Sequence, residues 1–387
     1  GDAFRALVRG LAAAPAATSD EAWALLLTPR PTPKLTRELT QLVAAARLDM
    51  DRAFQIRPAP RVRLARLRLE MKRQNLDGFV VPRGDEHQSE YVPRAADRLA
   101  WLTGFTGSAG VALVLHDKAA LLIDGRYTLQ ARTETDPKLY RVLSSRDTTP
   151  GSWFANAAGL KPRIGYDPWL LSQSQARSLR AALQPIQGEA VACARNPLDA
   201  VWRDRPPAPI SPAQIHPRRH AGTSSAAKRA RVAALLRRAG ADALILTLPD
   251  SIAWLLNVRG GDVPHTPRLL AFAILHADAR VDLFADARKL TPSVRRHLGR
   301  RTRIRPTEDL GSALDALGRA RRRIRLCPDT VSAWFFDRLS RAKATIVPGP
   351  DPCQAIKAAK TAAELAGIRR AHRRDGAALV RFLAWLA

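Results

Sequence analysis

The amino-acid sequence predicts an α/β protein built from two similar domains in tandem. Three observations support this class. A chain of 387 residues is too long for one ordinary hydrophobic core and suggests two or three domains. Its composition, with 46% hydrophobic and 25% charged residues, is that of a soluble globular protein. An ordered series of helix and strand patterns occurs once between residues 61 and 193 and again between residues 228 and 347.

The first copy begins with an amphipathic helix. In RVRLARLRLEMKRQN, which starts at Arg61, the apolar residues Leu64, Leu67 and Met71 fall on one helical face. Short apolar runs bounded by turn residues then predict strands. The predicted strands are FVV (79–81), VALVL (111–115) and AALLID (119–124), with Trp101-Leu102 between the first two.

The same order of elements returns in the second copy. KRARVAALLRRAG carries Val232, Leu235, Leu236 and Ala239 at the i, i+3, i+4, i+7 spacing of a helical face. The predicted strands are ALIL (243–246), LLAFAIL (269–275) and VDLFAD (281–286), with Trp254-Leu255 in the place of Trp101-Leu102. Trp101 and Trp254 are therefore interpreted as core residues.

The later halves of the copies also correspond. RIGYDP (163–168) precedes a helix that begins near Ser172, where Gln175 completes a capping box. RIRLCP (323–328) precedes the helical SAWFFDRL (332–339), and each copy then has a short strand, AVAC (190–193) or ATIV (344–347). The predicted organisation is an extension of unknown role at 1–58, a first domain at 59–202, a Pro/Ser-rich linker at 203–224, a second domain at 225–352 and a C-terminal segment at 353–387.

The C-terminal segment predicts one long amphipathic helix over residues 357–386. Its face is marked by Leu365, Ile368, His372, Leu379, Phe382 and Leu386. No third copy follows this helix in the sequence, so it has no obvious packing partner. We expect it to be the first element of a further domain.

Charge is the strongest feature of the composition. Lys and Arg outnumber Asp and Glu by 63 to 35, which gives a formal net charge of +28. Such a charge is typical of nucleic-acid-binding proteins. However, the basic clusters at 228–238 and 319–325 lie on helical patterns and have no interleaved aromatic residues that could stack on bases. A solvated basic face is the favoured interpretation, and nucleic-acid binding is the least favoured of the functions considered.

Cysteine usage and hydropathy indicate a compartment. Cys193, Cys327 and Cys353 are far apart and odd in number, so they form no disulfide framework and favour a reducing environment. No apolar run approaches the roughly 18 residues that a membrane-spanning helix needs. We therefore expect a cytoplasmic protein with no membrane partner.

The sequence offers no complete catalytic constellation. Its eight histidines are scattered, and no HExxH or GxSxG motif occurs. Asp85, Glu86 and His87 bring three potential ligands together, but adjacent residues rarely point at one ion, so no metal site is predicted. Ser108 in GFTGSAG is interpreted as part of a tight turn before a strand. His87 and His265 are interpreted as packing or loop histidines, with a domain interface as the alternative.

Arg126, in LLIDGRYTLQA (121–131), has a long charged side chain that the predicted local structure does not explain. The apolar run before it predicts a buried strand, Asp124-Gly125 a turn, and the residues from Arg126 to near Glu134 a helix. The turn needs Asp and Gly but not a long guanidinium. From composition alone, a surface salt bridge or a contact at the start of the helix is the favoured interpretation of Arg126, and binding is the alternative.

Five segments are long and specific enough to identify a family. They are GDEHQSEYV (84–92), RLAWLTGFTGSAG (98–110), LLIDGRYTLQA (121–131), IAWLLNVRGGDVPHTP (252–267) and ELAGIRRAHRRDGAALVRFLAWL (364–386). Together they resemble the Xaa-Pro aminopeptidases, in the three-domain aminopeptidase P branch of the creatinase/prolidase metallopeptidases. The resemblance runs in order from about residue 61 to the last residue.

The resemblance implies two creatinase/prolidase N-terminal-type domains, each a mixed sheet flanked by helices, followed by only the first helix of a catalytic domain with the "pita-bread" fold. In the family that domain holds two divalent metals, usually manganese, and the enzyme removes an N-terminal residue that precedes proline. The resemblance further implies that every metal ligand lies beyond Ala387. This chain is therefore expected to have no catalytic residue, no metal ligand and no cofactor of its own, and to be inactive alone.

The resemblance also implies roles for this part of the family enzyme. Arg126, in the DGRY motif, is expected to bind the peptide substrate, which has proline at position two. Family members commonly form homodimers, so substrate access and dimerisation are the expected roles. Two other functions stay open: a non-catalytic binding or assembly module that uses the exposed face of the C-terminal helix, and electrostatic binding of nucleic acid.

Overall fold

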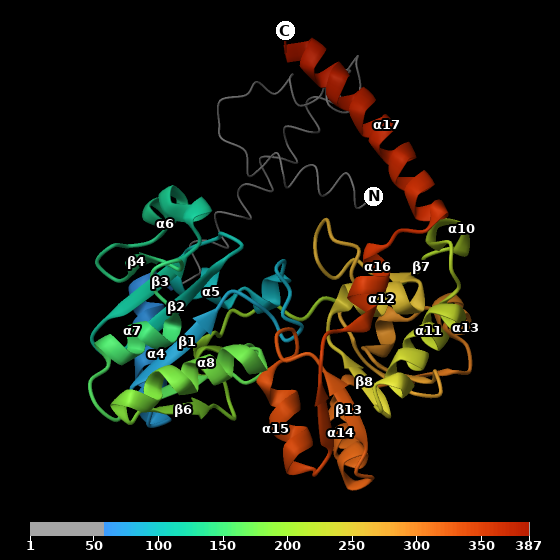
Figure 1. The fold of residues 1–387 in the computed structure, drawn as a ribbon. Helices are drawn as coiled ribbons and strands as arrows, with labels where there is room; N and C mark the ends of the chain where they lie inside the picture. The colour runs from blue at the N-terminus through green and yellow to red at the C-terminus, as the bar shows by residue number, and fades with distance from the viewer. Residues whose placement is uncertain (1–57, 387) are drawn as a thin grey trace. The chain divides into compact units, whose positions relative to one another are not determined.

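The computed structural model describes residues 58–386. Nearly all of the extension expected at residues 1–58 lies outside the described residues. Two sheets organise the rest of the chain, one in a first lobe (residues 64–202) and one in a second lobe (residues 213–358) (Figure 1).

The first lobe contains a six-stranded mixed sheet with the strand order β4-β3-β2-β1-β5-β6. Its strands are β1 (Gly78–Pro82), β2 (Gly110–Leu115), β3 (Ala119–Ile123), β4 (Arg141–Ser144), β5 (Arg163–Tyr166) and β6 (Glu189–Ala192). Strand β2 runs antiparallel to β1 and β3, whereas the pairs β3–β4, β1–β5 and β5–β6 are parallel. Strand β2 therefore runs in the opposite direction to the other five strands.

Helices cover both faces of this sheet because the buried strand residues alternate between faces. Phe79 and Val81 pack with Leu64, Leu67 and Met71 of the first helix on one face, and Val80 packs with helices α7 and α8 on the other. The helices are α4 (Pro60–Arg73), α5 (Arg98–Thr103), α6 (Thr128–Glu134), α7 (Pro150–Ala157), α8 (Gln173–Leu183) and α9 (Pro197–Val201), with 3₁₀ turns η1 (Arg94–Ala96), η2 (Gly125–Tyr127) and η3 (Gln184–Ile186).

The second lobe repeats this arrangement, with the strand order β12-β11-β10-β8-β13-β14. Its strands are β8 (Ala243–Leu246), β10 (Phe272–His276), β11 (Val281–Phe284), β12 (Thr302–Arg305), β13 (Arg323–Leu326) and β14 (Thr345–Pro348). Its helices are α11 (Ser225–Arg238), α12 (Pro249–Leu256), α13 (Pro292–Leu298), α14 (Leu310–Arg319), α15 (Ala333–Arg341) and α16 (Pro352–Ala358), with turns η4 (Ala287–Lys289) and η5 (Thr307–Asp309). The predicted α/β class with two similar mixed-sheet domains is confirmed.

Several local predictions are also confirmed. Trp101 and Trp254 are buried, at 2% and 8% exposure. Ser172 and Gln175 form the predicted capping box at the start of α8. The three cysteines are free and buried. Strand β10, however, begins at Phe272 and not at residue 269, because Leu270 N–H donates to the buried Asp262 carboxylate instead of to a neighbouring strand.

The segment expected to be a linker contains regular structure. Strand β7 (Gln214–Ile215) pairs with β9 (Val258–Arg259), and helix α10 (Arg218–Ala221) follows. Ala213 and Ala221 are buried. This part of residues 203–224 thus packs on the second lobe.

The prediction of one helix over residues 357–386 is wrong at its start. Helix α16 ends at Ala358, and a new helix, α17 (Ala362–Leu386), begins after Thr361. Thr361 and Glu364 form a capping box, in which each side chain accepts from the other residue's backbone N–H, and this pair fixes the new start. None of the described residues of α17 is buried.

The two lobes meet through reciprocal backbone contacts around a bridge between Ser172 and Ser332. Ala333 N–H donates to the Leu171 carbonyl, and Gln173 N–H donates to the Val331 carbonyl. Trp334 N–H donates to the Pro168 carbonyl, and Ser174 N–H to the Pro328 carbonyl. Residues that occupy equivalent places in the two copies therefore exchange equivalent bonds, so the junction has an approximate two-fold symmetry.

Candidate functional site

Arg126 lies on an exposed turn at the end of the buried strand β3. Asp124 caps the turn η2, and its Oδ1 atom accepts from Arg126 N–H at 3.0 Å and from Arg126 Nε at 2.8 Å. The Arg126 side chain is 63% exposed. The hydrogen bonds that Asp124 accepts from Arg126 lower the pKa of the Asp124 carboxyl. A surface salt bridge, the interpretation that composition alone favours, thus describes the contacts of Arg126 within the described part of the chain.

The Arg126 guanidinium packs near the ring of Tyr127. Arg126 Cζ lies 5.2 Å from the centre of this ring, the Tyr127 hydroxyl lies 2.7 Å from Ser108 Oγ, and Phe105 packs edge-on at 5.7 Å. At Gly107 a Cβ atom would lie 2.2 Å from the Phe105 ring and 2.9 Å from Tyr127. The segment GFTGSAG therefore leads into β2, as predicted, and also positions the residue next to Arg126.

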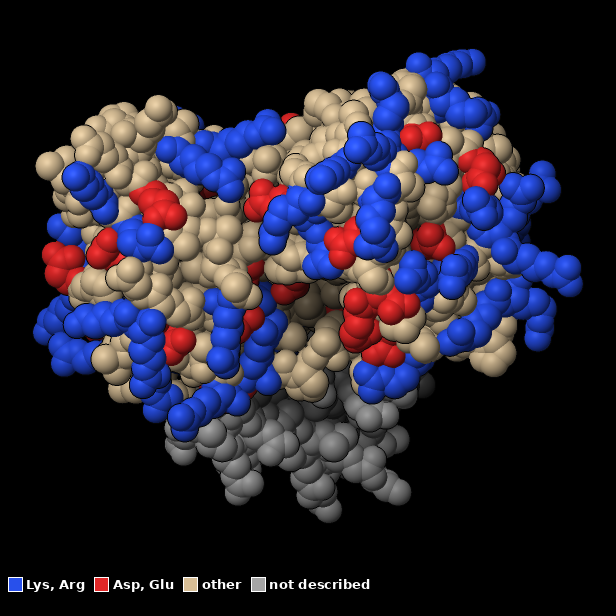
Figure 2. Space-filling view, turned by 90° about the horizontal axis from the view of Figure 1, so that it is seen from below, with Lys and Arg blue, Asp and Glu red and all other residues tan. Residues whose placement is uncertain are grey.

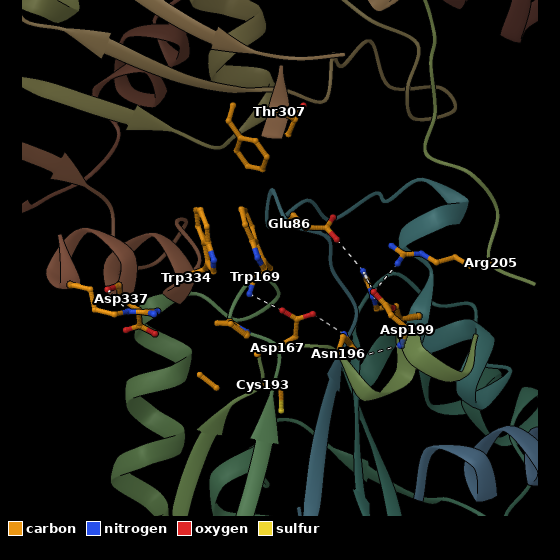
Figure 3. Close-up of a pocket in the computed structure, with 16 residues that line it drawn as sticks. Glu86, Asp167, Trp169, Cys193, Asn196, Asp199, Arg205, Thr307, Trp334 and Asp337 are labelled. Atoms are coloured by element: carbon orange, nitrogen blue, oxygen red, sulfur yellow. Dashed lines mark hydrogen bonds and ion pairs between the residues drawn. The ribbon is translucent and has the colours of Figure 1, made fainter. Parts of the chain in front are cut away.

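A second candidate site is a cavity of about 640 Å³ where the two lobes meet. Figure 3 shows the Trp169 and Trp334 rings side by side in its middle, with Glu86, Asp199 and Arg205 to one side and Asp337 to the other. The cavity combines aromatic walls with charged groups contributed by both lobes.

Arg98 is the most buried charge in this cavity, with a side chain only 2% exposed. Its Nε and Nη2 atoms lie 2.8 and 2.9 Å from the two carboxylate oxygens of Asp199, and Nη2 lies 3.0 Å from Glu86 Oε1. Burial opposes the charge on Arg98, but the hydrogen bonds to Asp199 and the charge of Glu86 outweigh it and raise the pKa of Arg98. Arg205 Nη1 also binds Asp199, at 2.7 Å. This network holds helices α5 and α9 together.

Asp167 and Cys193 lie at the base of the cavity. Asp167 accepts from Trp169 N–H at 2.9 Å and from Asn196 Nδ2 at 2.8 Å, yet burial raises the pKa of its carboxyl. Burial also raises the pKa of the Cys193 thiol to about 11. A buried thiol with such a pKa is a poor nucleophile, so the cavity contains no activated cysteine.

The consecutive residues Asp85, Glu86 and His87 do not form a metal site. Asp85 Oδ1 accepts from the backbone N–H groups of His87 and Ser89, Glu86 binds Arg98, and His87 Nδ1 lies 3.0 Å from the Thr247 carbonyl. The His87 ring stacks on Phe272 at 4.4 Å. His87 is thus a packing histidine that also lines the junction of the lobes.

The described residues do not fit a two-metal centre. Within residues 58–386, no group of three or more His, Cys, Asp or Glu side chains is placed to hold a metal ion. His216 and His220 lie with ring centres 6.1 Å apart, and burial with nearby Arg259 lowers the pKa of His216 to about 4. His265 lies on an exposed loop, as interpreted from the sequence.

Sequence reasoning missed the residues of the cavity between the lobes. Arg98 and Asp199 are about a hundred positions apart, and Trp169 and Trp334 belong to different copies of the repeat. One sequence feature could have indicated part of this cavity. Trp169 directly follows RIGYDP, and this segment of the first copy corresponds to RIRLCP in the second copy. That alignment of the copies places both segments at the junction but does not predict a stacked pair.

Comparison with known proteins identifies related sequences along most of the chain. Residues 63–199 and residues 204–364 each match the creatinase/prolidase N-terminal domain family. The "Probable Xaa-Pro aminopeptidase P" of Coccidioides posadasii is 35% identical over 93% of this chain and 56% of its own length. The protein of the same name from Aspergillus clavatus is 35% identical over 84% of this chain and 50% of its own length.

Solved structures agree with these sequence relatives. The X-prolyl aminopeptidase from Caenorhabditis elegans, described as a cytosolic enzyme with a di-nuclear active site, superimposes with a TM-score of 0.81 at 26% identity. The match covers 85% of this chain and 56% of that protein. The chain thus spans about half the length of the relatives that it matches. No helix among residues 58–386 is long and apolar enough to cross a membrane.

Proposed function

Because the chain belongs to the creatinase/prolidase N-terminal domain family, we propose that it is part of an Xaa-Pro aminopeptidase, which hydrolyses the bond between an N-terminal residue and a following proline. Relatives that share about a third of the residues over the matched part carry that name. By analogy with the Caenorhabditis elegans enzyme, we assign the protein to the cytoplasm, which suits its three free, buried cysteines.

In this proposal Arg126 binds the peptide substrate. The observation that supports the role is an exposed guanidinium held at a fixed position by Asp124 and Tyr127. Only Nε is used in this contact: neither Nη group of Arg126 makes a hydrogen bond within residues 58–386. These groups are available to donate to a peptide carbonyl or carboxylate.

We propose that the metal centre of this enzyme is formed by residues other than residues 58–386. Two divalent metals, which we propose to be manganese, would supply an activated water and polarise the scissile carbonyl. Because the side chains of residues 58–386 do not gather into a ligand set, we propose that the 387-residue chain does not hydrolyse peptides by itself. In this proposal the chain contributes Arg126 to the substrate site and controls the access of the peptide substrate to that site.

The test is an assay of the protein encoded by the complete reading frame, with manganese, on a peptide that has proline at position two. Loss of a charge-assisted hydrogen bond of about 1.5–3 kcal/mol predicts that Arg126→Ala lowers kcat/KM by roughly 10- to 150-fold. Arg132→Ala, which removes an exposed arginine of the same helix region, is the matched control and should keep the wild-type rate. Equal rates for the two variants would refute the role of Arg126.

Two further outcomes bear on the wider proposal. No cleavage of the peptide by the complete protein would refute the assignment as an Xaa-Pro aminopeptidase. Cleavage by the 387-residue chain alone would refute the proposal that the chain is inactive by itself.

A second candidate function, an assembly module, is favoured by helix α17. Leu379, Phe382 and Trp385 are 56%, 48% and 60% exposed on this helix, and exposed apolar groups of this size often mark an interface. We propose that the intact protein forms a homodimer, and light scattering after size-exclusion chromatography tests it. A monomer at micromolar concentration would contradict the dimer but leave the proposed activity untouched.

A further inference from the structure

The sheet of the second lobe gathers the starts of five strands along one edge. Strand β10 is antiparallel to β8 and β11, while the pairs β11–β12, β8–β13 and β13–β14 are parallel. All strands except β10 therefore point the same way, and the turns that lead into them lie at the same edge. These turns come from positions spread over about a hundred residues of sequence.

Each of these turns, or the helix or strand residue next to it, carries Arg or Lys. The basic residues, here called the basic edge, are Arg237–Arg238 before β8, Arg280 before β11, Arg300–Arg301 before β12, Arg321–Arg323 before β13 and Lys343 before β14. All of them are exposed. Figure 2, which views the molecule from below, shows Lys and Arg side chains crowded on its right-hand side.

Few acidic groups neutralise the basic edge. The same turns contain Asp242, which lies 3.8 Å from Arg322, and Asp278, which lies 2.6 Å from Arg280. Within the described part of the chain, the side chains of Arg238, Arg300 and Arg321 make no hydrogen bond or ion pair, and the same holds for Lys343. These side chains are free to bind a ligand from solution.

The first lobe provides an internal comparison, because the same fold places the same edge there. Its basic residues are Lys72, Arg73, Lys118, Lys138, Arg141, Lys161 and Arg163, and its acidic residues are Asp77, Asp117, Asp136 and Glu189. Arg163 pairs with Glu189, and Lys118 lies 3.6 Å from Asp117. An arginine-rich composition alone would charge both edges alike, so the excess on the second lobe requires a local explanation.

We propose that the basic edge of the second lobe binds the phosphate backbone of double-stranded nucleic acid. Six strands about 4.8 Å apart make an edge roughly 24 Å wide, along which a duplex presents about 14 phosphate charges. No large apolar side chain is exposed in these turns, so the edge has nothing to insert into a lipid surface. It also has no aromatic ring on which single-stranded bases could stack.

The experiment measures binding of a short fluorescent DNA duplex to the 387-residue chain by anisotropy, from about 50 to 200 mM salt. The edge variant is R238Q/R300Q/R321Q/K343Q, which removes one unbonded cation from each of four turns. The matched control is R73Q/K118Q/K138Q/K161Q, which removes the same charge from the corresponding edge of the first lobe. Circular dichroism confirms that both variants are folded.

Each contact with a phosphate contributes about 0.9 to the slope of log K against log salt. We expect the edge variant to bind more than tenfold more weakly and with a slope shallower by about 3.6, and the control to stay close to the wild type. Equal losses in the two variants would overturn the proposal, because net charge alone would explain binding. Absence of binding at about 150 mM salt, or tighter binding to anionic vesicles or to single strands than to the duplex, would overturn it as well.

Discussion

The indole rings of Trp169 and Trp334 stack across the junction of the two lobes, with centroids 3.9 Å apart and planes inclined by 21°. Since Ser172 and Ser332 are equivalent positions, Trp169 is the counterpart of Asp329 and Ser174 is the counterpart of Trp334. The stacked pair therefore takes the place that the Ser174–Asp329 hydrogen bond, at 2.6 Å, takes on the other side of the junction. One of two equivalent contacts is apolar and the other is polar.

Trp334→Ala should destabilise the protein by about 2 kcal/mol, because it removes a partly buried aromatic pair between the lobes. Urea unfolding followed by fluorescence measures the change. Trp385→Ala, the same substitution at a position that is 60% exposed on α17, should change stability by less than about 0.5 kcal/mol. Similar losses at the two positions would show that the stack contributes nothing specific.

Arg98→Met should cost about 3 kcal/mol, because it leaves the carboxylates of Asp199 and Glu86 without their buried partner. The control is Arg288→Met, which breaks an exposed pair with Asp286 and should cost less than about 1 kcal/mol. Chemical unfolding of both variants provides the measurement. A loss at Arg98 no larger than at Arg288 would contradict the structural role of the network.

Gly107→Ala should destabilise the Arg126 turn by about 1–3 kcal/mol, since its Cβ would overlap the rings of Phe105 and Tyr127. Gly125→Ala is the matched control in the same turn, where a Cβ would meet no atom within 4 Å. Thermal unfolding compares the two variants. Equal melting temperatures would mean that the rings move aside without cost.

His216 should titrate near pH 4 in the folded protein, because burial disfavours its charged form. Its pKa is lower in the folded than in the unfolded chain, so the unfolded chain binds more protons between about pH 4 and 6.5. Stability is thus expected to fall as the pH drops through this window, and His216→Gln should flatten that dependence. Imidazole signals in NMR spectra report the titration directly, and a midpoint near 6.5 would contradict the burial.

The organisation of the chain was predictable from the sequence because it depends on local patterns. Apolar periodicity located the strands around Phe79 and Ala243, and the repeated Trp101 and Trp254 correctly indicated equivalent core positions. The start of α17 was predicted too early because Lys357 continues the helical pattern, while the Thr361–Glu364 capping box decides where the new helix begins.

By itself, then, the sequence determined two sibling α/β lobes and an arginine on a turn after a buried strand, because hydrophobic period and turn chemistry act over a few residues. Only the tertiary structure decided which distant groups meet: Arg98 with Asp199, Trp169 with Trp334, and the five turns of the basic edge. The physical reason is that these contacts arise from the order and direction of strands and from the packing of one lobe on the other. Neither of these leaves a periodic signal in the chain.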